Sequence, residues 1–294
     1  MIKRRSLPIA AIVVLVLLCI YLISMALPLL WGLMTTFKEY GDFRLEKILP
    51  TFPMTFANYI EAFKGFALTV QSGPWMKLNN GVVYFEGMLL NSFLYSLGGA
   101  FVQTAVTCIT AYSTSRFNFK FNKVVYAIVV VTMILPIIGS LPSELKMADT
   151  FGLMDNMLGM YVLKANFLGM HYLIFHAMFK GIPKDFDEAA YIDGAGNIAI
   201  FFRIMLPLIS GTFLTIMLLK FIDFWNDYMT PMVFLPSYPT ISYGLLELTR
   251  AHKMAGGTPA ELAACIMVFI PNFVIFVVFR NKLIGNISMG GLKE

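Results

Sequence analysis

The chain has 294 residues, of which 58% are hydrophobic and only 13% are charged, and its mean hydropathy is +0.74. Soluble domains contain about 45–50% apolar and about 25% charged residues, so this composition excludes an ordinary soluble protein. The net charge of +5 comes from Lys and Arg residues that flank long apolar runs, and it gives no indication of nucleic-acid binding.

Long stretches without an ionisable side chain account for the composition. Four of them lie at 6–37, 87–115, 124–143 and 262–279. Each is close to or longer than the ~20 residues that an α-helix needs to cross the hydrocarbon core. Two further apolar segments, 160–179 and 208–235, are long enough but contain internal charges. The sequence therefore predicts an all-α membrane protein with six transmembrane helices.

The chain divides into three predicted parts. Residues 1–36 hold a basic tail and the first span, whose apolar run is too long for a cleaved secretory signal. Residues 37–86 form an extracytoplasmic segment in which we expect short helical turns. Residues 87–294 form the core transmembrane domain, with spans at 87–112, 124–141, 160–179, 208–235 and 260–283. Pro136 and Pro142 are expected to bend or break the third span.

The positions of Lys and Arg predict the orientation of the spans. Four basic clusters fall on one side of the membrane if there are six spans, which places both termini in the cytoplasm. The first external segment also carries cations, but its length of about 50 residues weakens their influence on topology. The four clusters are Lys3, Arg4 and Arg5; Arg116, Lys120 and Lys123; Lys180, Lys184 and Arg203; and Arg280, Lys282 and Lys293.

This orientation has a direct test. Cysteines introduced near Met1 and near Glu294 are expected to resist a membrane-impermeant thiol reagent in intact cells, because both ends are predicted to face the cytoplasm. Labelling of either cysteine would overturn the predicted orientation.

One motif lies between the fourth and fifth predicted spans, where residues 187–207 read DEAAYIDGAGNIAIFFRIMLP. The stretch resembles the "EAA" loop of permease subunits in binding-protein-dependent ATP-binding-cassette (ABC) importers. In that family the pattern is Glu-Ala-Ala, then a glycine after three intervening residues, and then Ile-x-Leu-Pro after nine more. The pattern is matched without an insertion by Glu188, Ala189, Ala190, Gly194, Ile204, Leu206 and Pro207.

The residues of this loop, 181–207, predict a compact knob. Asp185 is expected to cap a short helix, with Glu188 in the reciprocal capping position. Gly194 and Gly196 are expected to end that helix and turn the chain. A second short helix is predicted over 197–203, and Pro207 suits the first turn of the fifth span. The alternative is an ordinary amphipathic loop on the bilayer surface.

The resemblance implies how such a knob acts. In the family it docks on a separate ATPase subunit and carries the closing motion of the ATPase into the membrane helices. The chain has no GxxxxGK[ST] sequence, so ATP and Mg are expected to be used by the partner, with no cofactor bound here. The loop also contains a GxGxxA match at Gly194, Gly196 and Ala199, which is rejected as a dinucleotide site because no strand precedes it.

Polar residues inside the fifth span predict part of a translocation path. Ionisable groups in a membrane span are costly and are functional candidates. The stretch 221–228, FIDFWNDY, resembles an aromatic element of carbohydrate permeases, especially the maltose-type second permease, that helps line the cavity. The path residues predicted here are Asp223, Trp225, Asn226, Asp227 and Tyr228. The alternative is an interfacial Trp/Tyr belt with Lys220 and Asp223 as a local pair.

The amide of Asn226 is expected to lie inside the membrane, roughly 28 Å along the helix from Pro207. We expect a sugar hydroxyl as its partner, since aromatic rings and amides suit sugars. In the fourth span, Lys164 and Asn166 occupy positions at which the family often places residues that face the substrate.

The other polar side chains of the predicted bundle carry weaker signals. Gln103, Thr104, Thr107 and Thr110 are expected to make contacts between helices. His171 and His176 are five residues apart, so they face different sides of a helix and predict no metal site. Cys108 and Cys265 have no ligand spacing and are expected to be packing residues.

Together these features predict the permease subunit of an ATP-driven importer with a type I ABC importer permease fold, both termini inside, in a bacterial or archaeal cell membrane. The resemblance implies three kinds of protein partner: a homologous second permease in a heterodimer, two ATPase subunits, and an extracytoplasmic substrate-binding protein. The surroundings of the chain are expected to be membrane lipid. The solute is expected to be a sugar or oligosaccharide.

Three alternatives stay open at this point. The same machinery could carry another polar solute, such as a polyamine, an amino-sugar or a phosphorylated polyol. A proton-coupled secondary transporter could use Lys164, Asp223 and Asp227 as a relay, but it would normally show more helices or an internal repeat. A membrane-embedded enzyme is the third alternative, although the sequence shows no clustered set of His, Asp and Glu.

Overall fold

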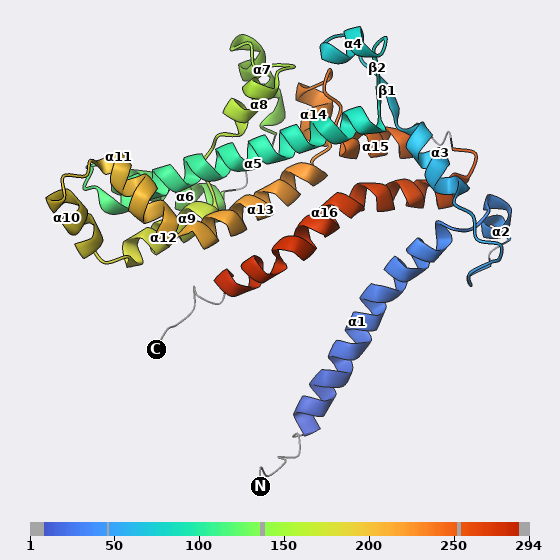
Figure 1. The fold of residues 1–294 in the computed structure, drawn as a ribbon, viewed down its shortest axis with the longest axis horizontal. Coiled ribbons are helices and arrows are strands. Elements are labelled where there is room, and N and C mark those ends of the chain that lie inside the picture. Colours follow the sequence, from blue (N-terminus) through green and yellow to red (C-terminus); the bar gives the residue numbers. More distant parts are fainter. Residues whose placement is uncertain (1–8, 46, 136–138, 252–253, 288–294) are drawn as a thin grey trace. The chain divides into compact units, whose positions relative to one another are not determined.

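The computed structural model describes residues 9–45, 47–135, 139–251 and 254–287, with side chains described as far as Arg280. Most of this structure is α-helical (Figure 1). By packing, the chain forms two compact units, one of residues 1–66 and 247–270 and one of residues 67–246 and 271–294. The predicted divisions at residues 36 and 86 follow membrane topology rather than packing, and they stay predictions.

The first unit contains the N-terminal helix α1 (Ile9–Thr35) and the short helices α2 (Tyr40–Arg44) and α3 (Ala57–Gly65). Helix α1 is apolar on all sides, and nearly all its side chains are exposed on this chain, as suits a helix surrounded by lipid or another subunit. Its end is fastened to α3 because Asn58 Nδ2 donates to the carbonyls of Thr36 at 2.8 Å and Lys38 at 2.7 Å.

The second unit begins with a small hairpin. Strands β1 (Ala67–Thr69) and β2 (Val82–Tyr84) pair antiparallel, with Leu68 opposite Val83, and α4 (Pro74–Leu78) lies in the connection. The sequence predicted only helical turns in this region. Strands of three residues are too short to show an alternating pattern, so the hairpin could not be distinguished from a turn.

Helix α5 (Phe85–Arg116) is the longest element of the second unit. Helices α8 (Met157–Lys164), α9 (Met170–Gly181) and α13 (Ser210–Asn226) pack along it, and Figure 1 shows α13 running beside it. The remaining helices are α6 (Asn122–Ile134), α7 (Leu141–Thr150), α10 (Asp185–Ile192), α11 (Asn197–Ile200), α12 (Leu206–Leu208), α14 (Met229–Phe234), α15 (Ile241–Ala251) and α16 (Gly257–Ile287).

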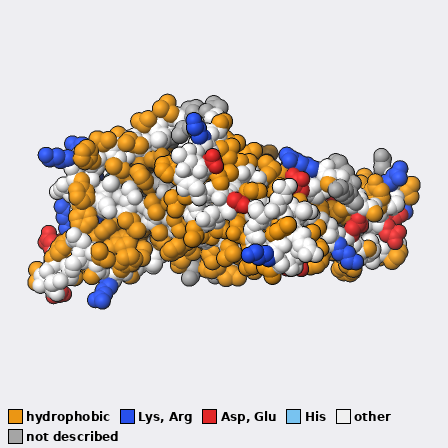
Figure 2. All heavy atoms as spheres, turned by 90° about the horizontal axis from the view of Figure 1, so that it is seen from above, with side chains coloured by type: hydrophobic (Ala, Val, Ile, Leu, Met, Phe, Trp, Pro, Cys, Tyr) orange, Lys and Arg blue, Asp and Glu red, His pale blue; other side chains and the backbone are white. Residues whose placement is uncertain are grey.

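Within the described residues, three helices are long and apolar enough to cross a membrane: α1, α5 and residues Gly257–Arg280 of α16. A fourth candidate is the pair Asn197–Leu208 and Ser210–Asn226, which is bent by 79°. The hydrophobic side chains that cover much of the face in Figure 2 fit a lipid environment. The structure thus confirms a helical membrane protein, whereas the count of six spans stays a prediction.

The predicted uninterrupted fourth span, 160–179, is wrong. Helix α8 ends at Lys164 and α9 starts at Met170, and Gly169 between them has a φ of +119°. One backbone group of the break finds a partner on α5, since Thr107 Oγ1 donates to the carbonyl of Asn166 at 3.3 Å. Such contacts make a broken helix tolerable at membrane depth.

The predicted third and fifth spans are also shorter than expected. Helix α6 ends at Ile134, and part of the region around Pro136 lies outside the described residues. The fifth span, predicted over 208–235, ends as one helix at Asn226, because Asp227 turns the chain before α14 begins. The stretch between the predicted fifth and sixth spans contains all of α15 and the start of α16.

Asp155 ties three connections of the second unit together. Its Oδ1 accepts a hydrogen bond from the amide of Ser237 at 2.8 Å. Its Oδ2 accepts from the hydroxyls of Ser237 at 2.6 Å and Ser72 at 3.2 Å. These bonds join three connections: the one after β1, the one before α8 and the one after α14. The start of α8 is therefore held close to the end of α14.

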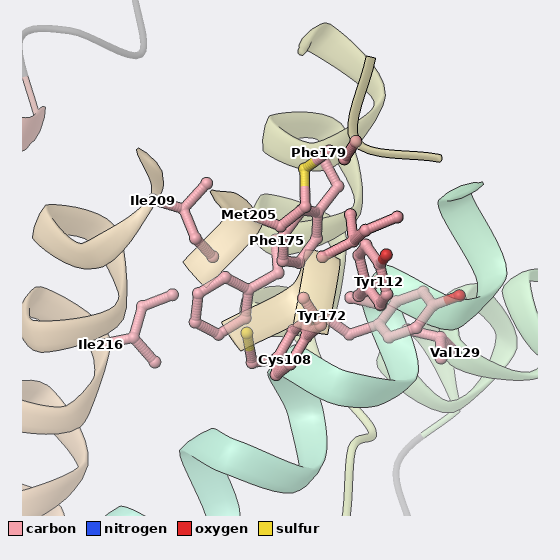
Figure 3. Packing of buried hydrophobic residues seen from close by; sticks show 13 residues of the cluster. Cys108, Tyr112, Val129, Tyr172, Phe175, Phe179, Met205, Ile209 and Ile216 are labelled. Carbon is pink, nitrogen blue, oxygen red and sulfur yellow. The ribbon is translucent and has the colours of Figure 1, made fainter. Parts of the chain in front are cut away.

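A hydrophobic core joins the last turns of α5 to α9, the 181–207 loop and the start of α13. Figure 3 shows Tyr112, Tyr172, Phe175, Phe179 and Met205 converging on one another. The Tyr112 ring lies 5.2 Å from that of Phe179 and 4.9 Å from that of Phe201, as measured between centroids. The loop is therefore packed onto the end of a long helix.

The three cysteines differ in how deeply they are buried. Cys108 is fully buried in this core, which confirms its packing role, whereas Cys19 and Cys265 are exposed on the chain.

Candidate functional site

The first limb of the loop is helix α10. Its first turn carries Asp185, Asp187 and Glu188, which interact favourably with the positive end of the helix dipole. Asp185 is not the N-cap, contrary to the prediction. Lys184 takes that position in helical conformation, its carbonyl already accepts from the amides of Asp187 and Glu188, and no side chain caps the helix.

Gly194 ends α10 in the predicted way. Its φ is +79°, its amide donates to the carbonyl of Tyr191 at 3.0 Å, and the amide of Ala195 donates to that of Ala190 at 2.9 Å. This left-handed conformation favours glycine. Apart from Gly194 and its two chain neighbours, no heavy atom of the described residues lies within 4 Å of the place that a Cβ on Gly194 would take. Gly196 instead has an extended backbone and needs no special conformation.

The second limb is helical over more residues than predicted. Helix α11 passes into a π-helical turn, η1 (Phe201–Met205), and then into α12. Pro207 lies in the first turn of α12 rather than of the fifth span, because the chain bends at Ile209 before α13. Ile204 and Leu206 are packed against the core, and Pro207 is exposed.

The outer side of the loop presents large apolar side chains. Ile192 is 86% exposed and Ile198 is 77% exposed, and Phe202 and Ala189 are exposed as well. Ala190, in contrast, is buried against the core. An exposed apolar group of this kind on a short, well-anchored element is typical of a protein–protein contact.

Arg116 and Asp187, neither of which belongs to the motif, connect the loop to α5. Arg116 Nη1 lies 3.4 Å from Asp187 Oδ2, and the two side chains are 5% and 17% exposed. From the sequence, Arg116 served only as one of the cations that predict the orientation of the chain in the membrane. No local pattern in the sequence indicates this pair, because the two residues lie on different helices.

Two of the predicted path residues line one cavity. A cavity of about 270 Å³ lies among α7, α8 and α14, and Lys164 and Asn166 both contribute to its wall. Lys164 Nζ donates to Thr230 Oγ1 at 3.1 Å, and Asn166 Oδ1 accepts from Gln103 Nε2 at 3.4 Å. The rest of the wall is formed by Glu144, Met147, Met160, Leu163, Thr230 and Phe234.

Asp227 connects this region to α5. Its Oδ2 accepts a hydrogen bond from Tyr95 Oη at 2.9 Å, and its Oδ1 accepts from the amide of Thr230 at 2.9 Å. Thr230 therefore lies between Lys164 and Asp227. Neither Tyr95 nor Thr230 was predicted, because a single tyrosine or threonine in an apolar run has no distinguishing pattern.

The other predicted path residues lie outside the cavity. Trp225 is 1% exposed, and its ring packs against those of Phe93 and Phe221. Asp223 is exposed and lies 3.4 Å from Lys220, as in the alternative interpretation of a local pair. Tyr228 is exposed. Trp225 thus serves as a packing residue within this chain.

Asn226 has two partners within the chain. Its Nδ2 donates to the carbonyl of Ile222 at 2.9 Å, and its Oδ1 accepts from Asn272 Nδ2 at 3.3 Å. The expectation that this amide needs an external partner is therefore wrong. Asn272, which was not predicted, retains a buried Oδ1 with no hydrogen-bond partner among the described residues.

Of the polar residues predicted to connect helices, Gln103 and Thr107 do so, both through Asn166. Thr110 bonds only to its own helix. His176 packs against the rings of Tyr126 and Tyr172. The described part of the chain contains no group of three or more His, Cys, Asp or Glu side chains that could hold a metal ion.

Comparison with known proteins agrees with this arrangement. The diacetylchitobiose uptake system permease protein NgcG of Streptomyces coelicolor is 24% identical over 277 residues, which cover 93% of this chain and 86% of that protein. The melibiose/raffinose/stachyose import permease protein MelC of Bacillus subtilis is 26% identical and covers 89% of each chain. The trehalose/maltose transport system permease protein MalG of Thermococcus litoralis is 24% identical over 99% of this chain and 97% of its own length.

A solved structure shows the same fold. It is the crystal structure of a bacterial ABC transporter involved in the import of the acidic polysaccharide alginate, and one of its chains matches with a TM-score of 0.74 and 23% identity. The match covers 93% of this chain and 96% of that chain. The fold is that of a type I ABC importer permease.

The helical fold, with the packed 181–207 loop between α9 and α13, is that of a membrane permease. The chain belongs to the family of binding-protein-dependent transport system inner membrane components, whose model matches residues 103–281. This confirms the family resemblance and the membrane location. It also favours an importer permease over a proton-coupled secondary transporter or a membrane-embedded enzyme.

Proposed function

We propose that this chain is the permease subunit of an ATP-driven importer for a sugar or oligosaccharide and forms half of its translocation path. The three relatives described above are named for the uptake of oligosaccharides or disaccharides. The likeness of residues 221–228 to the carbohydrate permeases also supports a sugar or oligosaccharide as the solute. Another polar solute carried by the same machinery is the second candidate.

The proposed assembly pairs this chain with a homologous second permease, two ATPase subunits and an extracytoplasmic substrate-binding protein. The observation that carries the proposal is the 181–207 loop, which matches the family motif and exposes Ile192 and Ile198. Apolar side chains of this size are suited to a groove on a partner subunit. The ATPase would bind and hydrolyse ATP with Mg, and this chain would contribute no covalent catalysis.

The geometry supports a simple transport cycle. Closure of the ATPase subunits moves the docked loop, and the loop moves the helices onto which it is packed. Helix α5 runs for roughly 48 Å at 1.5 Å per residue, so it reaches from the loop to the region of Tyr95 and Asp227. The helices then alternate between arrangements in which the path opens to opposite sides of the membrane.

The cavity beside Lys164 and Asn166 is our candidate for this chain's part of the path. Lys164 and Thr230 offer donors and Asn166 offers both a donor and an acceptor, which suits the hydroxyl groups of a sugar. The apolar part of the wall, which includes Phe234, suits its C–H faces. Asp223, Trp225 and Tyr228 receive no such support from their positions.

Reconstitution tests the proposal. The chain would be purified with its co-expressed partner subunits, placed in proteoliposomes and supplied with the binding protein and ATP. ATP-dependent uptake of a labelled oligosaccharide, with hydrolysis stimulated by the loaded binding protein, is the expected result. Uptake of a polyamine or a phosphorylated polyol but of no sugar would support the second candidate. Uptake driven by a proton gradient without ATP would contradict both.

Asn226 gives a finer test of the path. The change Asn226→Ala removes the only described partner of the Asn272 amide donor and is expected to reduce uptake or alter substrate preference without loss of assembly. The control is His171→Ala, a half-buried residue of α9 for which nearly normal uptake is expected. Unchanged uptake and selectivity in a correctly assembled Asn226→Ala complex would show that this position is not part of the path.

A further inference from the structure

Arg116 contacts both limbs of the 181–207 loop from the last position of α5. Its Nη1 lies 3.4 Å from Asp187 Oδ2 on α10, and its Nη2 lies 3.7 Å from Met205 Sδ on η1. The side chain is only 5% exposed. One guanidinium therefore bridges the helix that precedes Gly194 and the helical turn that follows it.

The surroundings make this contact important for the position of α10. Ala190 is the only residue of α10 that is buried, so apolar packing holds this helix weakly. A cavity of about 170 Å³ remains beside it, and Arg116, Lys184 and Glu188 are among its lining residues. The ion pair is thus a principal link between α10 and α5 within the described residues.

A buried arginine is a costly way to hold two helices together. Its Nε is buried and has no hydrogen-bond partner among the described residues. Apolar residues of similar size are often at least as stabilising as a buried ion pair. What this ion pair provides in addition is a charge attraction between one particular residue of α5 and one of α10, with 3.4 Å between Arg116 Nη1 and Asp187 Oδ2.

The far part of α5 is bonded to other elements of the second unit. Asn91 Nδ2 donates to the carbonyl of Pro239 at 3.0 Å, and Ser92 Oγ accepts from the amide of Ile241 at 2.7 Å. Tyr95 bonds to Asp227. Since α5 is one uninterrupted helix, a displacement of Arg116 is passed along the axis to these contacts.

We propose that Arg116 is a positioning residue that fastens α10 to α5 through Asp187, so that the two helices move as one body during the ATP-driven cycle. The proposal rests on the proposed function, because it assigns a role within the coupling of ATP hydrolysis to transport. Arg116 acts through Asp187 and the loop, and it contacts neither the solute nor the nucleotide.

The first experiment measures solute transported per ATP hydrolysed in the reconstituted complex, a ratio that does not depend on how much complex is present. Arg116→Met and Asp187→Asn are each expected to lower this ratio by about tenfold, within the range of ordinary coupling energies. Arg116→Lys keeps the charge opposite Asp187 and is expected to retain most of the ratio. Lys120→Met removes an exposed cation four positions further on and is expected to change nothing.

A second experiment measures the proposed common motion directly. Spin labels would be attached at Asn118→Cys, just after α5, and at Asp193→Cys, just after α10, both exposed positions. Cys19 and Cys265, which are exposed, would first be replaced with serine. The distance between the labels is expected to be the same in the nucleotide-free and ATP-bound complexes. With Arg116→Met it is expected to shift or broaden when ATP binds.

Each outcome decides the proposal. A normal transport ratio in both Arg116→Met and Asp187→Asn overturns it, as does a label distance that changes in the otherwise unaltered protein. Loss of the ATPase subunits from both variants also overturns it, because the pair would then serve docking rather than transmission. A complex with native Arg116 that hydrolyses no ATP would instead contradict the proposed function, and the two failures are thus distinguishable.

Discussion

Replacing Gly194 with aspartate is expected to abolish ATP-driven uptake while the permease remains in the membrane. Aspartate tolerates the positive φ of +79° better than most residues, and beyond the two chain neighbours nothing in the described part of the chain lies within 4 Å of its Cβ position. The side chain would therefore point away from the chain, into the space where the ATPase is proposed to dock. A carboxylate there would have to lose its hydration shell when the subunits dock, which is costly without a partner charge.

The effect would be measured as uptake and as ATP hydrolysis stimulated by the loaded binding protein, with the amount of permease in the membrane checked by immunoblotting. Two further changes at Gly194 separate charge from backbone geometry. Asparagine has the shape of aspartate without its charge and also tolerates this φ, whereas valine is strongly disfavoured there. If the loss of uptake comes from the contact with the ATPase, asparagine should retain more uptake than aspartate. If it comes from the backbone turn, valine should reduce uptake the most. Full uptake and full stimulation with aspartate would show that this loop does not couple the two proteins.

Replacing Asp227 with alanine is expected to lower stability by about 3–6 kcal/mol, the sum of two lost hydrogen bonds to a charged group, and to impair uptake. The carboxylate accepts hydrogen bonds from Tyr95 Oη and from the amide of Thr230, and bonds to a charged group contribute about 1.5–3 kcal/mol each. Loss of the second bond also removes a cap from the start of α14. Because Thr230 holds Lys164, the wall of the proposed path would change as well.

Asp223→Ala is the matched control, since this carboxylate lies four residues earlier, in the last turn of α13, but is exposed in its pair with Lys220. Such pairs contribute about 0.3–0.5 kcal/mol, so little change in thermal unfolding is expected. A double-mutant cycle with Tyr95→Phe isolates the bond between α5 and Asp227. The double variant should be less destabilised than the sum of the two single changes. Strict additivity would show that this bond contributes nothing.

The loop between α9 and α13 shows which structural features can be predicted from residues close together in the sequence. Its glycine turn at Gly194 and its second helix were predictable, because both depend on residues within a few positions of each other. The cap of α10 was misplaced by one residue, since Asp185 and Lys184 are both compatible with a helix start and only the surrounding chain decides between them. The anchoring of the loop by Arg116 was not predictable, because its partner Asp187 lies on a different helix.

The transmembrane helices show that the residues of the candidate path also cannot be predicted from local sequence alone. Residues 221–228 predicted one set of path residues, but the structure divides them between different environments. Trp225 is enclosed by Phe93 and Phe221, Asn226 bonds to Asn272, and Asp227 bonds to Tyr95. The side of a helix on which each residue lies follows from its periodicity, but what faces that side is set by the other helices.

What the sequence determined by itself is the class of protein. Uncharged runs long enough to cross a bilayer require helices, because lipid offers no partners for backbone polar groups. The spaced motif from Glu188 to Pro207 identifies the family, because it encodes a short helix, a turn and a second helix within one continuous segment. Only the tertiary structure decided where the fourth span breaks, which residues line the cavity beside Lys164, and how Arg116 fastens the loop. Each of these depends on contacts between segments far apart in the chain, such as Thr107 with Asn166 and Arg116 with Asp187. The free energy of such contacts exists only once the helices have packed, so no local pattern records it.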